Sequence, residues 1–571
     1  MNVSKLRRFV PVLVLLALVA ILVVAIAPAS AARGGVVKVQ ILAVNDFHGN
    51  LVPPSGSSGR VQTSPIGTLP VTTVDAGGAE YLATHIANLR AQNKRTIVVS
   101  AGDMIGATPL LSALFHDEPS IEAFNEIGLA FNAVGNHEFD EGTTELLRMQ
   151  SGGCHPVDGC QDGDGFFGAQ FKYLSANVVN EASGKTLFPP YRIRTFAGAK
   201  VAFIGMTLEG TPNIVTPSGI AGYEFRDEAD TVNALIPRLR RQGVETIVVL
   251  LHEGGFPTGI YNECPGISGP IVDIVERTND EVDLFITGHT HQAYNCVIDG
   301  RPVTSAMSFG RIVTDIDMEL SRATGEVASI AINNVIVTRD VPKDSAITAL
   351  IAKYQAIAAP LANRIIGQIT ADILRAQNAA GESALGDVIA DAQLDATDDP
   401  GFGDAVVAFM NPGGIRADFT YLSSAAGEGD GNVTYNESFT VQPFGNSLVT
   451  MTLTGAQIER LLEEQFAPCT LGSNRILQVS EGFEYAWSAS GGSCDKVDPA
   501  SIKIHGVVVN PAANYRVTVN SFLADGGDSF PVLVQGTDRL GGAVDTDALE
   551  AYFVANSPVA PGPQNRITVL P

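Results

Sequence analysis

The chain has 571 residues, of which 45% are hydrophobic and 17% charged, with 58 glycines and 31 prolines. This composition is typical of a globular, loop-rich protein and excludes a fibrous or disordered one, and the length predicts two domains. The formal charge of −25 would repel a polynucleotide backbone, so we expect no nucleic-acid polymer as partner. A small anionic ligand would need a local cation, which bound metal could supply.

The first 31 residues have the pattern of a signal peptide. Lys5, Arg7 and Arg8 precede an apolar run from Phe9 to Ala27, and Ala29-Ser30-Ala31 offers small residues for cleavage. The run is also long enough for an uncleaved membrane anchor, which is the alternative. Cleavage would change the charge from −25 to −28, because three basic residues leave. We predict a secreted or periplasm-like location in the cell envelope, without a stable membrane anchor after cleavage.

From about Val36 to Val335, short apolar runs alternate with segments of helical spacing. The helical segments include Ala79–Gln92 and Glu228–Gln242. The apolar runs are rich in valine, isoleucine and phenylalanine, which suits strands buried on both faces. They are Val37–Val44, Thr96–Ser100, Phe131–Val134, Thr246–Leu251 and Val282–Thr287. The pattern predicts an α/β domain.

A single amphipathic helix is predicted at Ser345–Asn363, as a connector between domains. Its apolar stripe comprises Ile347, Leu350, Ile351, Tyr354 and Leu361. From Ile365 onward we expect a second domain, with a helix at about Ser383–Ala396 and strands separated by glycine-rich turns.

Six cysteines are present, and an even number in an exported chain favours disulfides. They are Cys154, Cys160, Cys264, Cys296, Cys469 and Cys494. Six cysteines allow 15 pairings. We expect neighbours along the chain to pair, although the sequence leaves the other pairings open.

Each of the five predicted strands runs into a polar cluster. The clusters contain Asn45-Asp46-Phe47-His48, Gly102-Asp103, Gly135-Asn136-His137-Glu138, His252-Glu253 and Gly288-His289-Thr290-His291. Ligand sites in open α/β sheets gather beyond the carboxyl ends of strands, so the five clusters should converge. Carboxylate, amide and imidazole groups are ligands for divalent metals. Seven residues could fill two four-ligand shells if one carboxylate bridges two ions: Asp46, His48, Asp103, Asn136, His252, His289 and His291.

The order of these clusters resembles that of the calcineurin-type metallophosphoesterases. Three later motifs resemble the carboxyl-terminal domain of bacterial and animal 5′-nucleotidases: Asn411–Arg416, Gln442–Asn446 and Phe522–Phe530. The resemblance implies a four-layer αββα sandwich, a helical linker and a smaller α/β nucleotide-binding domain. The implied divisions are a signal peptide at 1–31, a phosphoesterase domain at 36–340, a linker at 341–364 and a substrate-binding domain at 365–571.

The resemblance also implies a role for each matched residue. Two divalent ions would be held, one by Asp46, His48, Asp103 and His291 and the other by Asp103, Asn136, His252 and His289. Catalytic His137 would face the scissile phosphate, oriented by Asp140. Five residues of the second domain, which we call the clamp, would hold the substrate. In the clamp, Asn411 and Arg416 would contact substrate, Phe444 and Phe522 would sandwich the base, and Asp528 would accept from the ribose hydroxyls.

This chain departs from the family pattern at one position that contacts the substrate phosphates. Animal nucleotidases carry an arginine where this chain has Gly381, just before Glu382 of the first helix of the second domain. Arg375 lies nearby in sequence and could substitute. Because of this departure, the sequence leaves open whether the substrate is a nucleoside monophosphate or a diphosphate.

The resulting hypothesis is an exported two-metal enzyme that releases phosphate from nucleoside 5′-phosphates. One alternative is a hydrolase of the same fold that acts on 2′,3′-cyclic nucleotides, nucleotide sugars or a sulfur ester. Another is a catalytically inactive secreted binding protein with a relic metal centre; the retained His137 and Asp140 argue against it. Zinc, manganese, magnesium, calcium and iron all suit the mixed ligands, and the oligomeric state is left open.

Overall fold

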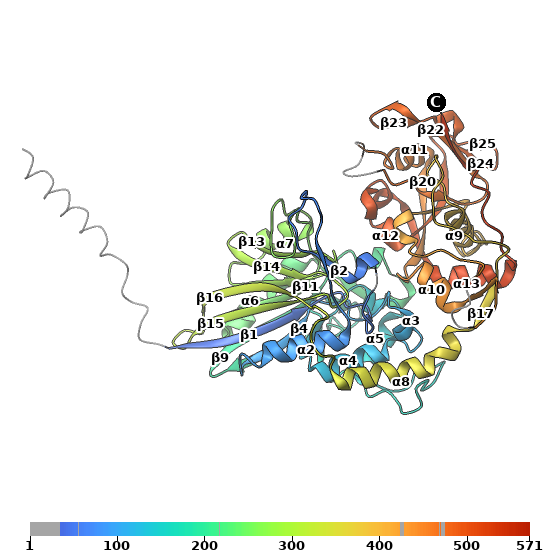
Figure 1. Cartoon of the computed structure of the whole chain (residues 1–571). Helices are drawn as coiled ribbons and strands as arrows, with labels where there is room; N and C mark the ends of the chain where they lie inside the picture. Colours follow the sequence, from blue (N-terminus) through green and yellow to red (C-terminus); the bar gives the residue numbers. More distant parts are fainter. Residues whose placement is uncertain are drawn as a thin grey trace, which may run out of the picture.

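Two six-stranded sheets packed face to face form the centre of the first half of the chain (Figure 1). The computed structural model describes residues 35–54, 56–215, 217–422, 427–467, 469 and 474–570. The predicted signal peptide lies outside these residues. The first sheet has the order β16 (Val327–Ile336), β15 (Ile312–Ser321), β1 (Val36–Val44), β4 (Thr96–Ser100), β5 (Phe131–Ala133), β6 (Lys172–Leu174). The second has the order β13 (Ala293–Ile298), β14 (Arg301–Ala306), β12 (Leu284–Thr287), β11 (Thr246–His252), β9 (Ala199–Thr207), β8 (Tyr191–Phe196).

The central strands are apolar on both faces because each face is covered. In β1, Ile41 points into the core between the sheets, whereas Leu42 packs under helices. In β11, Leu250 lies in the same inner core and Val249 faces the opposite helical layer. Alternation along a strand sends successive side chains to opposite faces, so an uninterrupted apolar run belongs to a sheet covered on both sides.

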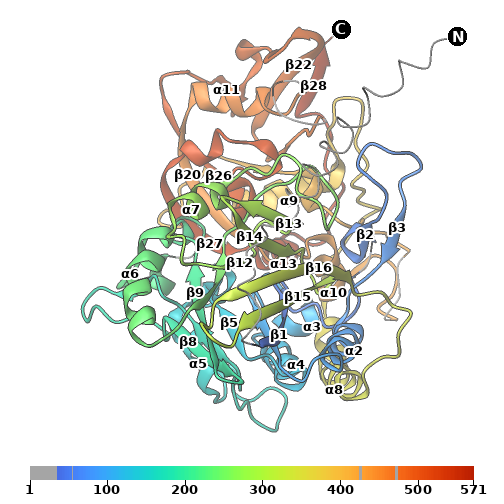
Figure 2. The same cartoon turned by 90° about the vertical axis from the view of Figure 1, so that its left-hand side faces the viewer.

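Helices form the two outer layers. The first sheet is covered by α2 (Ala79–Arg90), α4 (Glu118–Ile127) and α5 (Gly142–Ser151). The second is covered by α6 (Glu228–Arg241) and α7 (Pro270–Arg277). Figure 2 shows α6 on one side of the sheets and α2 on the other. The predicted four-layer αββα arrangement is confirmed.

Strand direction sets where the polar clusters meet. Strands β1, β4 and β5 are parallel neighbours, and so are β9, β11 and β12 in the other sheet. Their carboxyl ends meet at one edge of the sandwich, where the residues that follow them are brought together.

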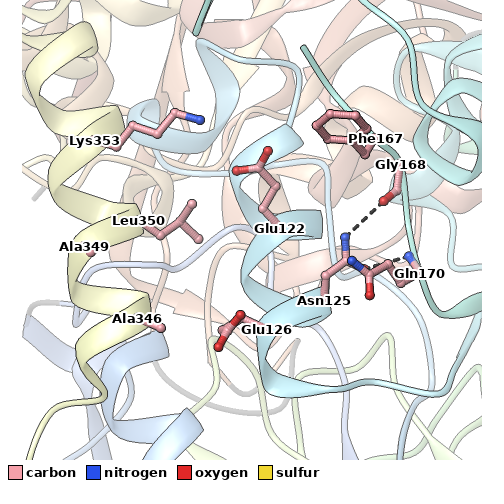
Figure 3. A pocket seen from close by; sticks show the side chains of 10 residues that line it. All are labelled: Glu122, Asn125, Glu126, Phe167, Gly168, Gln170, Ala346, Ala349, Leu350 and Lys353. Atoms are coloured by element: carbon pink, nitrogen blue, oxygen red, sulfur yellow. Dashed lines mark hydrogen bonds between the residues drawn. The ribbon is translucent and has the colours of Figure 1, made fainter. Parts of the chain in front are cut away.

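Helix α8 (Ser345–Ala362) follows the sandwich and leads to the second half of the chain. In the described part of the chain it alone is long and apolar enough to cross a membrane. However, its buried residues Ile347, Ile351 and Tyr354 pack against the first half. Leu361, predicted on the same stripe, is 43% exposed, because it lies in the last turn beyond this contact. A hollow of about 520 Å³ lies beside the contact between α8 and α4 and is lined by Lys353 and Glu122, among others (Figure 3).

The second half is an α/β unit built on a five-stranded sheet. Its strand order is β21 (Gln478–Val479), β18 (Val407–Met410), β26 (Asn514–Asn520), β20 (Ser447–Thr454), β27 (Thr537–Val544). Helices α9 (Ala384–Asp395) and α13 (Asp545–Asn556) contribute to one apolar core, and α11 (Gly455–Glu463) to another. A second five-stranded sheet contains β22 (Phe483–Gly492), β23 (Asp495–Val497), β24 (Lys503–Ile504), β25 (Val507–Val508) and β28 (Ile567–Leu570). The domain limits given above stay a prediction.

The three expected disulfides are all formed. They join Cys154 to Cys160, Cys264 to Cys296, and Cys469 to Cys494. Each therefore closes a loop between cysteines that are neighbours in sequence.

The contact made by α8 can be tested by truncating its apolar side chains. Ile347 is fully buried, so Ile347→Ala should lower the free energy of unfolding of the first half by about 2–4 kcal/mol. Leu361→Ala on the same helix should change it by less than about 0.5 kcal/mol, because Leu361 is exposed. Denaturant unfolding followed by circular dichroism would measure both values. Equal losses would contradict the packing described here.

Candidate active site

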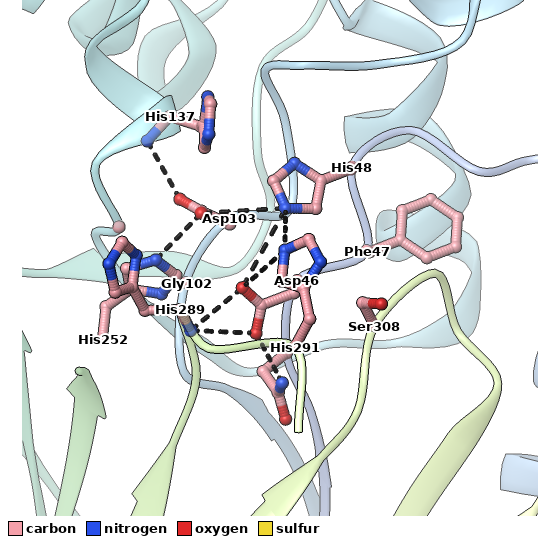
Figure 4. Close-up of polar contacts among 12 residues, drawn as sticks. Asp46, Phe47, His48, Gly102, Asp103, His137, His252, His289, His291 and Ser308 are labelled. Atoms are coloured by element: carbon pink, nitrogen blue, oxygen red, sulfur yellow. Dashed lines mark hydrogen bonds and ion pairs between the residues drawn. The ribbon is translucent and has the colours of Figure 1, made fainter. Parts of the chain in front are cut away.

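Seven predicted ligand residues meet at the shared edge of the two sheets, and Figure 4 labels all of them except Asn136. Asp46 and His48 follow β1, Asp103 follows β4, Asn136 follows β5, His252 ends β11, and His289 and His291 follow β12. Their donor atoms form two groups. Asp46, His48 and His291 offer ligand atoms within 4.8 Å of one another, and Asp103, His252 and His289 do the same.

In the first group, two imidazoles lie close to the Asp46 carboxylate. The Nε2 atom of His48 is 3.1 Å from Nε2 of His291 and 3.9 Å from Oδ1 of Asp46. His291 Nε2 is 3.5 Å from the same Asp46 oxygen. Metal–ligand bonds of about 2.0–2.2 Å in a tetrahedral shell separate the ligands by about 3.3–3.6 Å, so these spacings suit one ion.

In the second group, Asn136 supplies a further oxygen. Its Oδ1 is 3.1 Å from His252 Nε2 and 3.0 Å from His289 Nδ1. Oδ2 of Asp103 is 2.8 Å from His252 Nε2 and 3.8 Å from His48 Nε2 of the first group. Asp103 therefore lies between the two groups, where a bridging carboxylate would be needed.

The histidines present lone pairs to the site. His48 Nδ1 contacts the Gly106 carbonyl at 2.8 Å and His252 Nδ1 contacts the Ala101 carbonyl at 2.7 Å, which directs Nε2 of both rings inward. Burial lowers the pKa of His48 to about 4 and that of His289 to about 3, so both rings are neutral at pH 7. Neutral imidazole is the form that binds metal.

The backbone of the site is held in an uncommon conformation. Five of the seven residues have positive φ angles: Asp46 at 49°, His48 at 46°, Asp103 at 51°, His289 at 68° and His291 at 54°. Such strain is characteristic of functional sites. Burial lowers the pKa of His252, but the Asp103 carboxylate outweighs it and raises the pKa to about 9, so this ring would lose a proton on binding an ion. Two buried carboxylates, four imidazoles and an amide oxygen at these spacings fit two divalent ions.

His137 and Asp140 lie beside the ligands as a hydrogen-bonded pair. His137 Nδ1 is 2.8 Å from Oδ2 of Asp140, and the His137 backbone N–H donates to Asp103 Oδ1 at 2.9 Å. Burial lowers the pKa of His137, but Asp140 and Asp103 outweigh it and raise the pKa to about 10. The Asp140 contact leaves the Nε2 edge of the ring as the one that could meet a substrate.

Glu138 has a positioning role that our sequence analysis missed. Its buried carboxylate accepts backbone N–H groups from Asp103 at 2.9 Å, Met104 at 2.9 Å and Gly135 at 2.6 Å. The side chain of Asn132 donates to it at 3.1 Å. The only sequence signal was its place directly after His137.

Gly135 must lack a side chain because Asp103 occupies the space beside it. A methyl group built on Gly135 would overlap the Oδ1 atom of Asp103. Gly135 thus allows the ends of β4 and β5 to lie close to each other.

The predicted clamp residues lie together in the second half. Asn411 Nδ2 donates to Asp528 Oδ2 at 2.8 Å, and Arg475, which we did not predict, donates to the Asp528 carbonyl at 2.9 Å. The Arg416 guanidinium stands over the Phe444 ring, 5.5 Å from its centroid. Phe522 is 46% exposed, and its ring lies so close to Gly527 that a side chain there would collide with it.

The part of the second half that carries the clamp contacts the part of the first half that carries the predicted ligand residues. A methyl group on Gly445 would lie 3.3 Å from Cα of Ala107, next to the Gly106 carbonyl that orients His48. The Arg416 guanidinium also donates to the Ser57 hydroxyl at 2.8 Å.

Gly381 cannot be replaced by an arginine without rearrangement. Its φ is +87°, and a side chain there would collide with Ile476. Arg375 instead donates to the Arg416 carbonyl at 3.0 Å, so the two guanidinium-bearing residues are neighbours.

Two family models match the chain. Residues 39–293 match the calcineurin-like phosphoesterase model, and residues 365–535 match the 5′-nucleotidase C-terminal domain. Together they take in most of the chain, in the order that the motifs predict.

Similarity over nearly the whole of this chain agrees with these matches. The chain is 30% identical to the endonuclease YhcR of Bacillus subtilis, over 93% of this chain and 41% of that protein. It is 31% identical to the cell wall protein Lmo0130 of Listeria monocytogenes, over 90% of this chain and 66% of that protein. The chain thus spans less than two thirds of the length of either relative.

A solved structure covers nearly the whole fold. The 5′-nucleotidase precursor of Thermus thermophilus matches with a TM-score of 0.59 and 26% identity, over 93% of this chain and 99% of that one. The predicted resemblance is thereby confirmed. The chain belongs to the 5′-nucleotidase family of metal-dependent phosphoester hydrolases, in which a calcineurin-like phosphoesterase domain precedes a 5′-nucleotidase C-terminal domain.

Proposed function

We propose that this protein is an exported hydrolase that releases phosphate from nucleoside 5′-phosphates with the help of two divalent metal ions. The observation that carries the proposal is the pair of ligand groups on either side of Asp103, with the His137–Asp140 pair beside them. Zinc or manganese would suit this mixed set of nitrogen and oxygen ligands.

Asp46, His48, Asp103 and His291 would hold one ion, and Asp103, Asn136, His252 and His289 the other. When bound, such a pair of ions supplies an acidified water and positive charge to the phosphoryl oxygens. Asp140 would keep His137 oriented through the 2.8 Å contact at Nδ1. His137 would then stabilise, through Nε2, the charge that develops on the transferred phosphoryl group or leaving oxygen.

The clamp supports a nucleoside as the leaving group. The half-exposed Phe522, and Phe444 on the ring face away from Arg416, would offer surfaces on which any base could stack, which predicts tolerance among bases. Asp528 is kept in place by Asn411 and could accept from ribose hydroxyls. Arg416 and its neighbour Arg375 would provide the positive charge for the phosphates.

Export is supported by cysteine chemistry. All six cysteines are paired, and disulfides persist in oxidising compartments outside the cytoplasm. The N-terminal pattern of basic residues, apolar run and small residues points the same way.

The first test is phosphate release by the purified protein after chelation and readdition of single metals. AMP, ADP, 2′,3′-cyclic AMP, UDP-glucose and single-stranded DNA would be compared, with a coupled phosphatase to reveal diester cleavage. We expect metal-dependent turnover of AMP. His137→Ala should lower kcat about 10²- to 10⁴-fold, with the ions at the two ligand groups retained, because in this proposal His137 faces the phosphate and does not hold an ion.

The matched control is His505→Ala, since His505 is exposed and lies in the second half. Turnover of only 2′,3′-cyclic AMP or UDP-glucose would contradict the proposed substrate. It would assign the protein to the hydrolases of the same fold that act on cyclic nucleotides or nucleotide sugars. DNA cleavage alone would favour a nuclease, against the charge of −25. No turnover with two ions bound would favour a binding protein.

The second prediction concerns Glu138. Glu138→Gln keeps the shape of the side chain but replaces one acceptor oxygen by a donor, which would face backbone N–H groups. Because these contacts position Asp103 and Asn136, metal affinity should fall about 10- to 100-fold. Titration of the metal-free protein with Zn²⁺ against a competing chelator would measure it. Unchanged affinity would show that Glu138 does not position the ligands.

The third prediction concerns the clamp. Phe444→Ala should raise the KM for AMP about 5- to 150-fold, because stacking on one aromatic ring contributes about 1–3 kcal/mol per base. Its kcat at saturation should change much less, since the metal ligands are untouched. Phe402→Ala serves as control, because Phe402 is 67% exposed and carries no predicted role. Equal kinetics in the two variants would remove Phe444 from the substrate site.

A further inference from the structure

The backbone of Gly106 lies between a predicted metal ligand and the proposed catalytic histidine. Its carbonyl oxygen accepts a hydrogen bond from His48 Nδ1 at 2.8 Å, which directs Nε2 of that ring inward. On its other side, Gly106 packs against the His137–Asp140 pair. A methyl group built on Gly106 would overlap the His137 carbonyl oxygen and would lie 2.7 Å from Oδ2 of Asp140. A shift of Gly106 would therefore displace both His48 and His137.

The rings of His48 and His137 are also neighbours. Their centroids are 5.1 Å apart, and the rings meet edge to face at an angle of 79° (Figure 4). Gly106 itself has a φ of +79°, a conformation that glycine adopts readily and most other residues avoid. The geometry of both rings therefore depends on what holds the backbone at Gly106.

The carboxylate of Asp117 holds this backbone. Oδ2 of Asp117 accepts the N–H of Gly106 at 2.8 Å, so Gly106 is fixed at its nitrogen while its carbonyl fixes His48. Asp117 is only 7% exposed, and burial raises its pKa to about 6, so the carboxylate is mainly ionised at pH 7. A hydrogen bond to a charged acceptor is stronger than one to a neutral acceptor.

The place of Asp117 in the sequence predicts a different role for its side chain. Asp117 immediately precedes α4, where an aspartate side chain commonly accepts a backbone N–H of the first helical turn. Among the described residues, its carboxylate forms no such hydrogen bond. The side chain instead reaches back across 11 residues to Gly106. Helix capping therefore does not explain the carboxylate.

We propose that Asp117 is a positioning residue for the active site, which acts through the backbone of Gly106 on both His48 and His137. Groups that lie behind a metal ligand orient it, and their removal commonly lowers metal affinity about 10- to 100-fold. The part of the proposal that concerns His137 rests on the function proposed above. The part that concerns His48 needs only the ion.

Asp117 would act on one of the two ligand groups and not on the other. The Gly106 carbonyl contacts His48 of the first group. In the second group, His252 is oriented by the carbonyl of Ala101, which belongs to a different segment. Loss of the Asp117 carboxylate should therefore weaken the ion of the first group selectively.

The competing interpretation is a purely structural role, in which Asp117 stabilises the turn before α4. Its loss would then lower the Tm, and ion binding would stay unchanged or weaken equally at both groups. The φ of Asp117 is +61°, so Asp117→Gly removes the carboxylate without backbone strain. Asp117→Asn keeps an oxygen that can accept the Gly106 N–H, and asparagine tolerates this φ as well.

The experiment titrates the metal-free full chain with Zn²⁺ against a competing chelator, in two backgrounds. His289→Ala removes a ligand of the second group, and His291→Ala removes one of the first. Added to His289→Ala, Asp117→Gly should weaken the remaining ion about 10- to 100-fold. Added to His291→Ala, it should leave the affinity of the remaining ion unchanged. Asp117→Asn should restore the affinity in the first case.

Hydrogen exchange of the Gly106 amide gives a second measurement that needs no metal. This amide should exchange faster in Asp117→Gly than in the parent, and Asp117→Asn should keep its protection. Ser120→Ala is the matched control on α4, because the buried Ser120 hydroxyl contacts Ser112 Oγ at 2.7 Å. It should lower the Tm and leave both the zinc affinities and the Gly106 amide unchanged.

Equal zinc affinity with and without the Asp117 carboxylate, or equal weakening in the two backgrounds, would overturn the proposal in favour of the structural role. At saturating Zn²⁺, Asp117→Gly should also lower kcat for AMP about 10- to 100-fold, because His137 would be displaced. An unchanged kcat would overturn the part that concerns His137. No AMP turnover by the parent would contradict the proposed function but leave the zinc result standing, so the two failures are distinguishable.

Discussion

The buried carboxylate of Glu138 accepts backbone N–H groups from Asp103, Met104 and Gly135, and so ties the end of β4 to the end of β5. The ligand carboxylate of Asp103 can be positioned only if the backbone on both sides of it is held. Burial, and to a lesser extent the nearby Asp103, raise the pKa of Glu138 to about 7, which reflects the electrostatic cost of burying this carboxylate beside a second one. A cation between the ligand groups would lower that cost, so metal binding and the folding of these strand ends should be coupled.

Much of this arrangement can be predicted from the sequence, because both fold and ligands depend on local patterns. The apolar runs at Ile41–Val44 of β1, Ile97–Val99 of β4 and Ile247–Leu251 of β11 are typical of strands covered on both faces, and this requirement dictates the layers. Parallel neighbours bring their carboxyl ends to one edge, so residues as distant in sequence as Asp46 and His291 meet there. The family resemblance supplied what pattern alone could not, namely the shared position of Asp103 and the placing of the clamp.

Other features depend on tertiary contacts that produce no periodic pattern in the sequence. Leu361 fits the stripe of α8 by spacing, yet the helix extends beyond the surface that buries its earlier turns. Arg475 reaches Asp528 from a separate segment, and no local motif marks it. His116 and His155 look like unrelated polar residues in the sequence, because only the fold of the loop closed by the Cys154–Cys160 disulfide stacks one ring on the other.

The disulfides close loops with sequence separations of only 6, 32 and 25 residues, and they follow one another without overlap. If the chain is exported from its N-terminus, as proposed above, each cysteine would meet its partner before the next pair appears. No bond would then have to wait for a later segment or be exchanged. Such an order would leave fewer wrong pairings open to the chain during oxidation.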